Sequence, residues 1–384
     1  MQKRFALKLA AACAFAAVAG LSHAQQTIKI ANIVELSGPG TTAGTLFKNG
    51  VELAVKEINE AGGILGKKIE STTVDTQTNP GVAKGLTQKA VDDNVFAIFG
   101  PVYSGSIMVS MAESKRGEVP NFTGGEAAGI TQQGNPYIFR TSFTQASAMP
   151  KIARYIKEKV KAKTVDIIFV NNDFGKGGRD LIIKSLQDNG VKIGADVSTE
   201  SGQIDFSSAV IKVKQSSSDA VFVYTNEEEA ARVLRELKKQ GYNKPVIGET
   251  VLTSQKVIEL AGEFADGAIA HVGLTADAPN ANIRAYKAKF QKEYGFVPDH
   301  NAIKGYTGVY VLKAAIEKVG KFDRKEVAKA MHGIKILAKD HPGVLLDIAF
   351  DDKGDLDRES YFVQVKNGKQ EVIQTFQPAF TSKK

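Results

Sequence analysis

The stretch TIKIANIV (27–34) opens a β-α-β unit that decides the fold class. Its apolar and β-branched residues predict a strand. It is followed by LFKNGVELAVKEINEAGG (46–63), which carries apolar residues on one helical face and ends at two glycines, and by KKIESTTVD (67–75), which predicts a second strand. A strand, an amphipathic helix and another strand in this order are typical of a parallel sheet covered by helices.

The same alternation continues to residue 123 and restarts after residue 145. In the first part we expect helices over 80–93 and 104–116, and strands over 96–100 and 119–123. In the second part, helices are predicted over 146–160, 175–190, 206–216 and 227–242, and strands over 164–170, 191–198, 219–225 and 245–249. Residues 281–331 read as helices, and 343–376 as hairpins around DDKGD and KNGK. The pattern predicts an α/β protein with two doubly wound lobes.

No Pro- or Ser-rich linker separates the two predicted lobes, so the chain must pass between them through short segments. The chain is expected to pass between the lobes near 141–145, near 272–276 and close to Tyr361. We therefore assign 25–144 plus 273–360 to an N-terminal lobe and 145–272 plus 361–384 to a C-terminal lobe. Three short crossovers form a hinge that permits one bending motion, which places binding between the lobes.

Residues 1–24 have the composition of a secretory signal peptide. Lys3, Arg4 and Lys8 form a basic start, a run of thirteen apolar residues covers 9–21, and Ser22-His23-Ala24 offers a cleavage site. We therefore expect an exported, periplasmic protein of 360 residues. Lipidation at Cys13 is disfavoured because only four apolar residues separate it from Lys8.

The amino-acid composition argues against nucleic-acid binding and against disulfide or Cys-based metal sites. The full chain carries 50 basic and 42 acidic residues, and removal of the leader's three basic residues leaves a formal charge of +5. No block of five basic residues occurs, so a nucleic-acid partner is not expected. The only Cys lies in the leader, which excludes a disulfide framework or a Cys-based metal site in the mature chain.

Enzyme signatures are missing from the mature sequence. It contains no His-Glu-x-x-His, no phosphate-binding P-loop and no Gly-x-Ser-x-Gly elbow. FGKGG (174–178) follows a predicted strand, but its spacing does not match a dinucleotide-binding loop. The four mature histidines are not paired at ligand spacing. We expect no enzyme activity, no cofactor and no metal.

Candidate binding residues lie where predicted strands run into helices, because ligands of open α/β sheets bind beyond the carboxyl ends of the strands. Tyr103 and Ser104 stand at the start of the helix after strand 96–100. The free amides of that helix end attract a carboxylate, and the Ser104 hydroxyl adds a donor. The alternative is that Ser104 caps its own helix.

Further candidates follow the other strands. Gly125, Glu126 and Ala127 belong to a small, flexible loop in which Glu126 can hold an ammonium group or remain a solvated acid. In the second lobe, Phe174 can cover an apolar ligand tail or belong to the core. Asn226, Glu249 and Thr250 stand at the ends of two further strands, and Glu249 is either a partner for a positive group or a surface acid.

Five segments together resemble a known family. TIKIANIVELSGPGTTAG, GVELAVKEINEAGGILGKKIE, FAIFGPVYSGS, IFRTSF and AFDDKGDLD are similar, in order and spacing, to the periplasmic branched-chain amino acid (leucine/isoleucine/valine) binding proteins of ABC importers. The likeness covers essentially the whole mature chain. It implies a type I periplasmic binding protein, in which two lobes joined by three crossovers clamp a ligand.

The resemblance also implies roles for residues. The family's carboxylate-binding serine maps onto Ser104, and its backbone-plus-threonine segment onto Gly125, Glu126 and Ala127. That threonine is absent unless a one-residue gap puts Glu126 in its place. The family's cleft tyrosines fall on Ala43, Phe174 and Asn226, and its ammonium-binding acid falls on Thr250 with Glu249 beside it.

The expected function is capture of a small amino acid, branched-chain or related, by cleft closure, followed by delivery to an inner-membrane ABC permease. Two alternatives stay open. The altered cleft positions permit an aromatic acid, an amide or a urea-like solute, and the protein could serve a sensory receptor instead of a transporter. The protein is expected to be a monomer.

Overall fold

The first lobe is built on a five-stranded parallel sheet. The computed structural model describes residues 27–380, so the predicted signal peptide lies outside the described residues. The strand order is β2-β1-β3-β4-β5. These strands are β1 (Thr27–Val34), β2 (Lys68–Asp75), β3 (Ala97–Phe99), β4 (Asn121–Thr123) and β5 (Ile138–Arg140).

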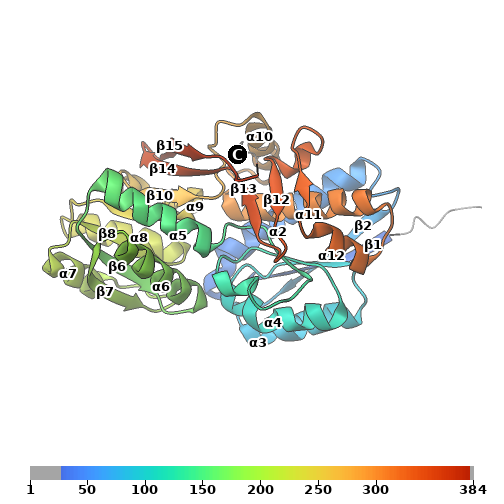
Figure 1. The fold of residues 1–384 in the computed structure, drawn as a ribbon, viewed down its shortest axis with the longest axis horizontal. Coiled ribbons are helices and arrows are strands. Elements are labelled where there is room, and N and C mark those ends of the chain that lie inside the picture. The colour runs from blue at the N-terminus through green and yellow to red at the C-terminus, as the bar shows by residue number, and fades with distance from the viewer. Residues whose placement is uncertain (1–26, 381–384) are drawn as a thin grey trace, which may run out of the picture.

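Helices cover both faces of this sheet (Figure 1). On one face, Ile30 and Phe99 pack in the same core as Phe47 of α2 and Leu312 of α11. On the other face, Ile98 lies in a smaller core with Ala90 of α3, next to α4. The helices are α2 (Thr41–Glu60), α3 (Pro80–Asp92), α4 (Ser104–Gly117), α10 (Ala281–Tyr294), α11 (His300–Val319) and α12 (Arg324–Met331).

The second lobe repeats this arrangement with an antiparallel addition. Five parallel strands in the order β7-β6-β8-β9-β10 continue into antiparallel β14 and β15. These strands are β6 (Thr164–Val170), β7 (Lys192–Thr199), β8 (Ala220–Tyr224), β9 (Val246–Glu249), β10 (Ile269–Val272), β14 (Ser360–Lys366) and β15 (Lys369–Phe376).

Its helices also form two layers. Ile152 of α5 and Ile182 of α6 lie in the core on one face, whereas Val210 of α7, Leu234 of α8 and Val257 of α9 lie in the core on the other. The helices are α5 (Gln145–Tyr155) with a π-helical extension (Ile156–Val160), α6 (Asp173–Asp188), α7 (Ser207–Ser216), α8 (Glu227–Lys239) and α9 (Gln255–Ala261). No helix in residues 27–380 is long and apolar enough to cross a membrane.

The chain crosses between the lobes three times, after β5, after β10 and between β13 and β14. Arg358, buried at the last crossing, links the other two, since its Nε donates to Gly273 O and its Nη1 to Thr141 O, each at 3.1 Å. A small antiparallel sheet of β11 (Lys335–Ile336), β12 (Ile348–Phe350) and β13 (Leu356–Arg358) precedes it.

The predicted fold class is confirmed, and the predicted strands and helices occur within a few residues of their expected bounds. Three strands, β5, β10 and β11, were not predicted, nor was the helical segment over 250–261. β5 and β11 contain only three and two residues, too few for a hydrophobic period to show. The lobe boundaries at 144, 272 and 360 stay a prediction.

Candidate ligand-binding site

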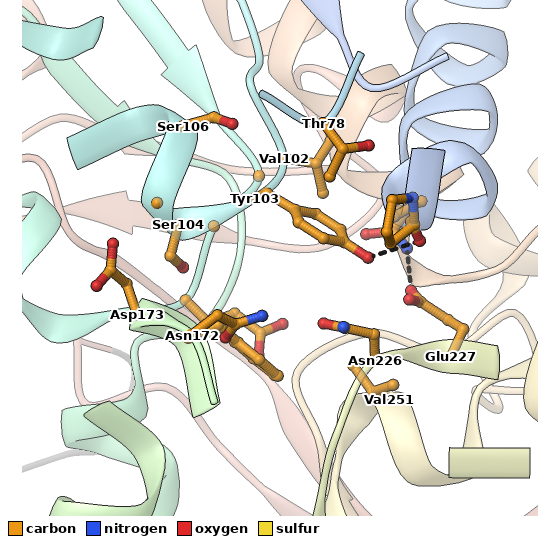
Figure 2. Close-up of a pocket in the computed structure, with 18 of the residues that line it drawn as sticks. Thr78, Val102, Tyr103, Ser104, Ser106, Asn172, Asp173, Asn226, Glu227 and Val251 are labelled. Atoms are coloured by element: carbon orange, nitrogen blue, oxygen red, sulfur yellow. Dashed lines mark hydrogen bonds between the residues drawn. The ribbon is translucent and has the colours of Figure 1, made fainter. Parts of the chain in front are cut away.

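A cavity of about 310 Å³ lies between the two lobes. It is at the small end of the range of pockets for small molecules, about 300–1,000 Å³. Figure 2 shows Tyr103 and Ser104 on one side of it, facing Asn172 and Asn226 on the other. Its lining consists of Pro39, Ala43, Thr78, Pro80, Val102, Tyr103, Ser104, Gly105, Ser106, Gly124, Gly125, Glu126, Asn172, Asp173, Phe174, Ser201, Asn226, Glu227, Val251, His300, Asn301 and Lys304.

The topology of the sheets explains the position of this cavity. In a strand order of 2-1-3-4-5 the connections leave in opposite directions from the first and third strands, which opens a crevice at their carboxyl ends. In the first lobe these strands are β1 and β3, which lead to Pro39 and Tyr103. The equivalent strands β6 and β8 lead to Asn172 and Asn226. The cavity therefore joins the crevices of both sheets.

The start of α4 presents donors to the cavity. Tyr103 is the N-cap residue, and its side chain makes no capping bond. Ser104 is the first helical residue, and its Oγ accepts a hydrogen bond from Ala127 N–H at 3.3 Å. The Ser104 side chain therefore connects α4 to the loop after β4 instead of capping its own helix. The first amides of α4 have no partner within the helix and make this end electropositive.

Glu35 holds the turn that leads into α4. Its buried carboxyl accepts hydrogen bonds from Val102 N–H and Tyr103 N–H, both at 3.1 Å. Burial raises the pKa of Glu35 to about 7, although these hydrogen bonds act in the opposite direction. Tyr103 is fixed further because its hydroxyl donates to Pro39 O at 2.9 Å.

The carboxylate of Glu126 is already paired within the protein. Lys304 Nζ lies 3.0 Å from Glu126 Oε1, and both side chains are buried. The same ammonium group donates to Gly124 O at 3.3 Å and to Asn301 Oδ1 at 3.4 Å. Tyr224 OH lies 3.5 Å from Glu126 Oε2. An ammonium group therefore occupies this part of the site before any ligand enters.

Three of the nine predicted site residues lie behind the lining and not in it: Ala127, Glu249 and Thr250. The buried Glu249 carboxyl accepts a hydrogen bond from Thr250 Oγ1 at 2.5 Å and lies against Glu126 of the lining. Burial, followed by the charge of Glu126, raises the pKa of Glu249 well above its usual range. The other six predicted residues, Tyr103, Ser104, Gly125, Glu126, Phe174 and Asn226, all line the cavity.

Phe174 forms an aromatic wall on the side of the second lobe. Its ring stacks on Tyr224 with centroids 4.2 Å apart. Gln145 holds both residues, since its Nε2 donates to Phe174 O at 2.8 Å and to Tyr224 OH at 3.0 Å. Phe174 is thus both a lining residue and part of the core, which unites the two predicted roles.

Several residues that line the cavity were not among the candidates predicted from the sequence. Glu227 begins α8, and His300, Asn301 and Lys304 lie in the first turns of α11. The sequence did contain a signal for Lys304. Residues 302–316 carry no charged residue besides Lys304 and Lys313, and a helix segment so poor in charge is expected to bury a lysine only where its ammonium group has a partner.

Three ionisable side chains, those of Glu227, Asp299 and His300, lie buried close to one another. Burial, followed by the charge of Glu228, raises the pKa of Glu227 to about 8, and burial raises that of Asp299 to about 6. Burial also lowers the pKa of His300 well below its usual range, so that its ring is neutral. Asn301 Nδ2 donates to Glu227 Oε1 at 3.1 Å and to Asp299 Oδ2 at 3.3 Å, which links the two lobes.

Two doubly wound lobes, three crossovers and a cavity between the lobes define a type I periplasmic binding protein. The chain belongs to the periplasmic binding protein family, whose model matches residues 27–370. It is 29% identical over 353 residues to the leucine-, isoleucine-, valine-, threonine- and alanine-binding protein of Pseudomonas aeruginosa, covering 91% of this chain and 92% of that protein. The members it resembles are solute-binding proteins of ABC transporters.

Solved structures show the same fold. The branched-chain amino acid binding protein LivJ of Streptococcus pneumoniae, in complex with isoleucine, aligns with a TM-score of 0.83 and 28% identity, covering 92% of this chain and all of that one. A solute-binding protein of an ABC transporter from R. palustris, in complex with benzoate, also has a TM-score of 0.83 but only 22% identity, covering 92% and 97% of the two chains. The second likeness concerns the fold alone.

Proposed function

We propose that this protein is the periplasmic solute-binding component of an ABC importer and that its ligand is a small carboxylic acid without an α-ammonium group, such as an aromatic acid of the size of benzoate. The observation that carries the proposal is the buried pair between Lys304 and Glu126. Glu126 is one of the two acids expected to receive a ligand ammonium, Glu249 being the other, and Lys304 already supplies an ammonium group to Glu126. A second ammonium beside Lys304 would be repelled by a like charge in a region of low dielectric.

The carboxylate of the ligand has a suitable site at the start of α4. The unpaired amides of that helix and the Ser104 hydroxyl converge on the cavity. Such helix ends bind anions because their N–H groups point at the ligand and the helix dipole is positive there. A hydrogen bond to a charged group contributes about 1.5–3 kcal/mol.

The rest of the cavity suits an apolar ring. Tyr103 and Phe174 line it together with Ala43, Val102 and Val251. Phe174 stacks on Tyr224, so its ring is held in place before a ligand arrives. A preformed aromatic wall reduces the entropy lost on binding, which favours a flat, rigid ligand.

The transport mechanism follows from the position of the cavity. A ligand that touches both lobes binds the closed state better than the open state and shifts the population toward closure. The first lobe would fix the carboxylate through Ser104, and the second would complete the cage through Phe174 and Asn226. Closure presents both lobes to the permease together and requires no chemical step.

A second candidate ligand is a branched-chain amino acid. Whole-length relatives are named for leucine, isoleucine and valine binding, and the lining contains two acids besides Glu126, namely Asp173 and Glu227. In that case one of these acids would receive the ligand ammonium.

Matched pairs of ligands that differ only in the α-ammonium group separate the two candidates. Protein stripped of bound solute by unfolding and refolding is titrated calorimetrically with leucine and 4-methylpentanoate, with phenylalanine and 3-phenylpropanoate, and with benzoate. We expect the desamino acid of each pair to bind more tightly than its amino acid, and benzoate to bind. Tighter binding of leucine than of 4-methylpentanoate would overturn the proposal in favour of the amino acid.

A further inference from the structure

Three potential metal ligands meet where the two lobes touch beside the cavity. They are Glu227, the first residue of α8 in the second lobe, and Asp299 and His300 at the start of α11 in the first lobe. One ligand atom from each lies within 4.8 Å of the other two, and all three residues are buried. Figure 2 shows the Glu227 carboxyl directed toward the opposite lobe, to which it is hydrogen bonded.

The buried imidazole of His300 is a second, independent observation that points to a ligand in this cluster. Its side chain is only 2% exposed, and its Nδ1 has no hydrogen-bond partner among residues 27–380. This atom lies 3.6 Å from Asp299 Oδ2, inside the cluster. A buried polar atom without a partner is costly, and a neutral imidazole nitrogen beside two carboxyl groups is a donor that transition metals bind readily.

The cluster also lacks a cation from the protein itself. Within residues 27–380, no Lys or Arg forms an ion pair with Glu227 or Asp299. Lys304 is the nearest candidate, but its ammonium group is committed to Glu126, Gly124 and Asn301. The Lys304 charge thus acts on both buried carboxyl groups from a distance, and neither has a directly paired Lys or Arg within residues 27–380.

We propose that Glu227, Asp299 and His300 form a zinc site that bridges the two lobes. The site shares Glu227 and His300 with the lining of the cavity, so a solute ammonium group would have to use Asp173 and not Glu227 while zinc is bound. One imidazole nitrogen and two carboxylate oxygens suit Zn²⁺, which keeps a fourth position for water in open sites. Bonds of about 2.0–2.2 Å in a tetrahedron place neighbouring ligand atoms about 3.4 Å apart, so the three donors move together by about one ångström when the ion binds.

The position of the site between lobes has a functional consequence. An ion held by Glu227 from one side and by Asp299 and His300 from the other stabilises the closed arrangement. Binding of zinc and binding of solute are then coupled, and each raises the affinity for the other by the same factor. The zinc ion would act on capture of the solute without taking part in any reaction.

Three substitutions remove one ligand each and leave different parts of the structure intact. Asp299→Asn removes a charge but keeps a side chain that caps α11, a role in which Asn equals Asp; the Asp299 carboxylate now accepts from Asn301 N–H and Ala302 N–H. Glu227→Gln and His300→Gln remove the other two ligands. His341→Gln, at a partly exposed histidine outside the cluster, is the matched control.

The experiment titrates ZnCl₂ into metal-free, solute-free protein at pH 7.5 in competition with a chromophoric chelator. We expect one zinc per chain in the wild type and in His341→Gln. Loss of an outer-shell partner alone typically weakens metal binding about 10–100-fold, so each ligand substitution should weaken it by at least that factor. Failure of the wild type to bind zinc, or unchanged affinity in both His300→Gln and Glu227→Gln, would overturn the site.

Two further measurements test the bridging role and guard against variants that fold poorly. Zinc should raise the melting temperature of the wild type and not that of His300→Gln. Small-angle X-ray scattering should show a smaller radius of gyration for the wild type once zinc is added, without solute. An unchanged radius of gyration alongside stoichiometric zinc binding would overturn the bridge between the lobes.

Discussion

Lys304 Nζ lies 3.0 Å from Glu126 Oε1, and the two buried side chains form an ion pair in the wall of the cavity between the lobes. Removing one partner of a buried ion pair leaves the charge of the other partner uncompensated. This costs far more stability than replacing both partners by uncharged residues. The pair therefore fixes the charge of the cavity wall as well as its shape. We expect stability to depend on it and, under the proposed function, ligand choice as well.

Lys304→Met should lower the free energy of unfolding by about 3–5 kcal/mol, because it leaves the Glu126 carboxylate buried and unpaired. The double variant Lys304→Met/Glu126→Gln should recover most of this loss. Urea denaturation measures both. Lys184→Met, which removes an exposed pair with Asp188, is the control and should change stability by less than about 1 kcal/mol. Equal stability of the single and double variants would contradict the pairing.

Ser104→Ala should weaken binding of a carboxylate ligand by about 1.5–3 kcal/mol, since it removes one hydrogen bond to a charged group. Calorimetry on the best ligand of the matched-pair series measures the change. Ser110→Ala is the control, because Ser110 lies buried on the same helix, bonds to Ile107 O and does not line the cavity. Unchanged affinity in Ser104→Ala would limit Ser104 to holding Ala127.

Phe174→Ala should reduce the affinity for an aromatic acid more than the affinity for an aliphatic acid of similar size. The ring offers a face for stacking, and aromatic pairs contribute about 0.5–1.5 kcal/mol beyond the area they bury. The ratio of the two dissociation constants, measured on wild type and variant, isolates this effect. Phe264→Ala, at an exposed position away from the cavity, should leave the ratio unchanged. An equal loss for both ligands would show that Phe174 merely fills space.

Glu35 should make stability depend on pH in a defined window. The unfolded carboxyl loses its proton near its usual pKa of 4.5, whereas the buried carboxyl keeps it up to a pKa of about 7. Between these values the folded state binds more protons, so raising the pH favours unfolding. The free energy of unfolding of the wild type, relative to Glu35→Gln, should fall by up to about 3 kcal/mol across this window and level off above it.

The measurement for Glu35 is a series of denaturant titrations of both proteins from pH 4 to pH 8. Taking the difference between the two proteins removes the contributions of other carboxyl groups that titrate in the same range. A difference that stays constant with pH, or that rises, would show that Glu35 is ionised in the folded protein.

The part of the site that could be predicted from sequence is the part that follows local rules. Ser104 and Asn226 stand at the starts of helices that follow parallel strands, and such starts always collect at one edge of a sheet. Their position in the chain therefore determines their position in space. The same rule located Phe174 and the loop that contains Gly125.

Lys304 and His300 could not be located in this way. They come from α11, which follows the second lobe in sequence and returns to pack against α2 of the first. The hydrophobic period of α11 does not indicate which of its turns faces a cavity that is formed with distant parts of the chain. Glu249 shows the opposite failure, because it stands at a strand end as expected but lies behind the lining, where Glu126 of the other lobe is its neighbour. Rotamer choice inside a packed interface is decided by neighbours that are distant in sequence.

Arg358 makes the three connections between the lobes behave as one part. Its guanidinium reaches a carbonyl group in each of the other two connections, at Thr141 and at Gly273. None of the three can slide past its neighbours without breaking a buried hydrogen bond, whereas all can bend together. We therefore expect the lobes to move mainly about one axis, which a distance between a label on each lobe would follow.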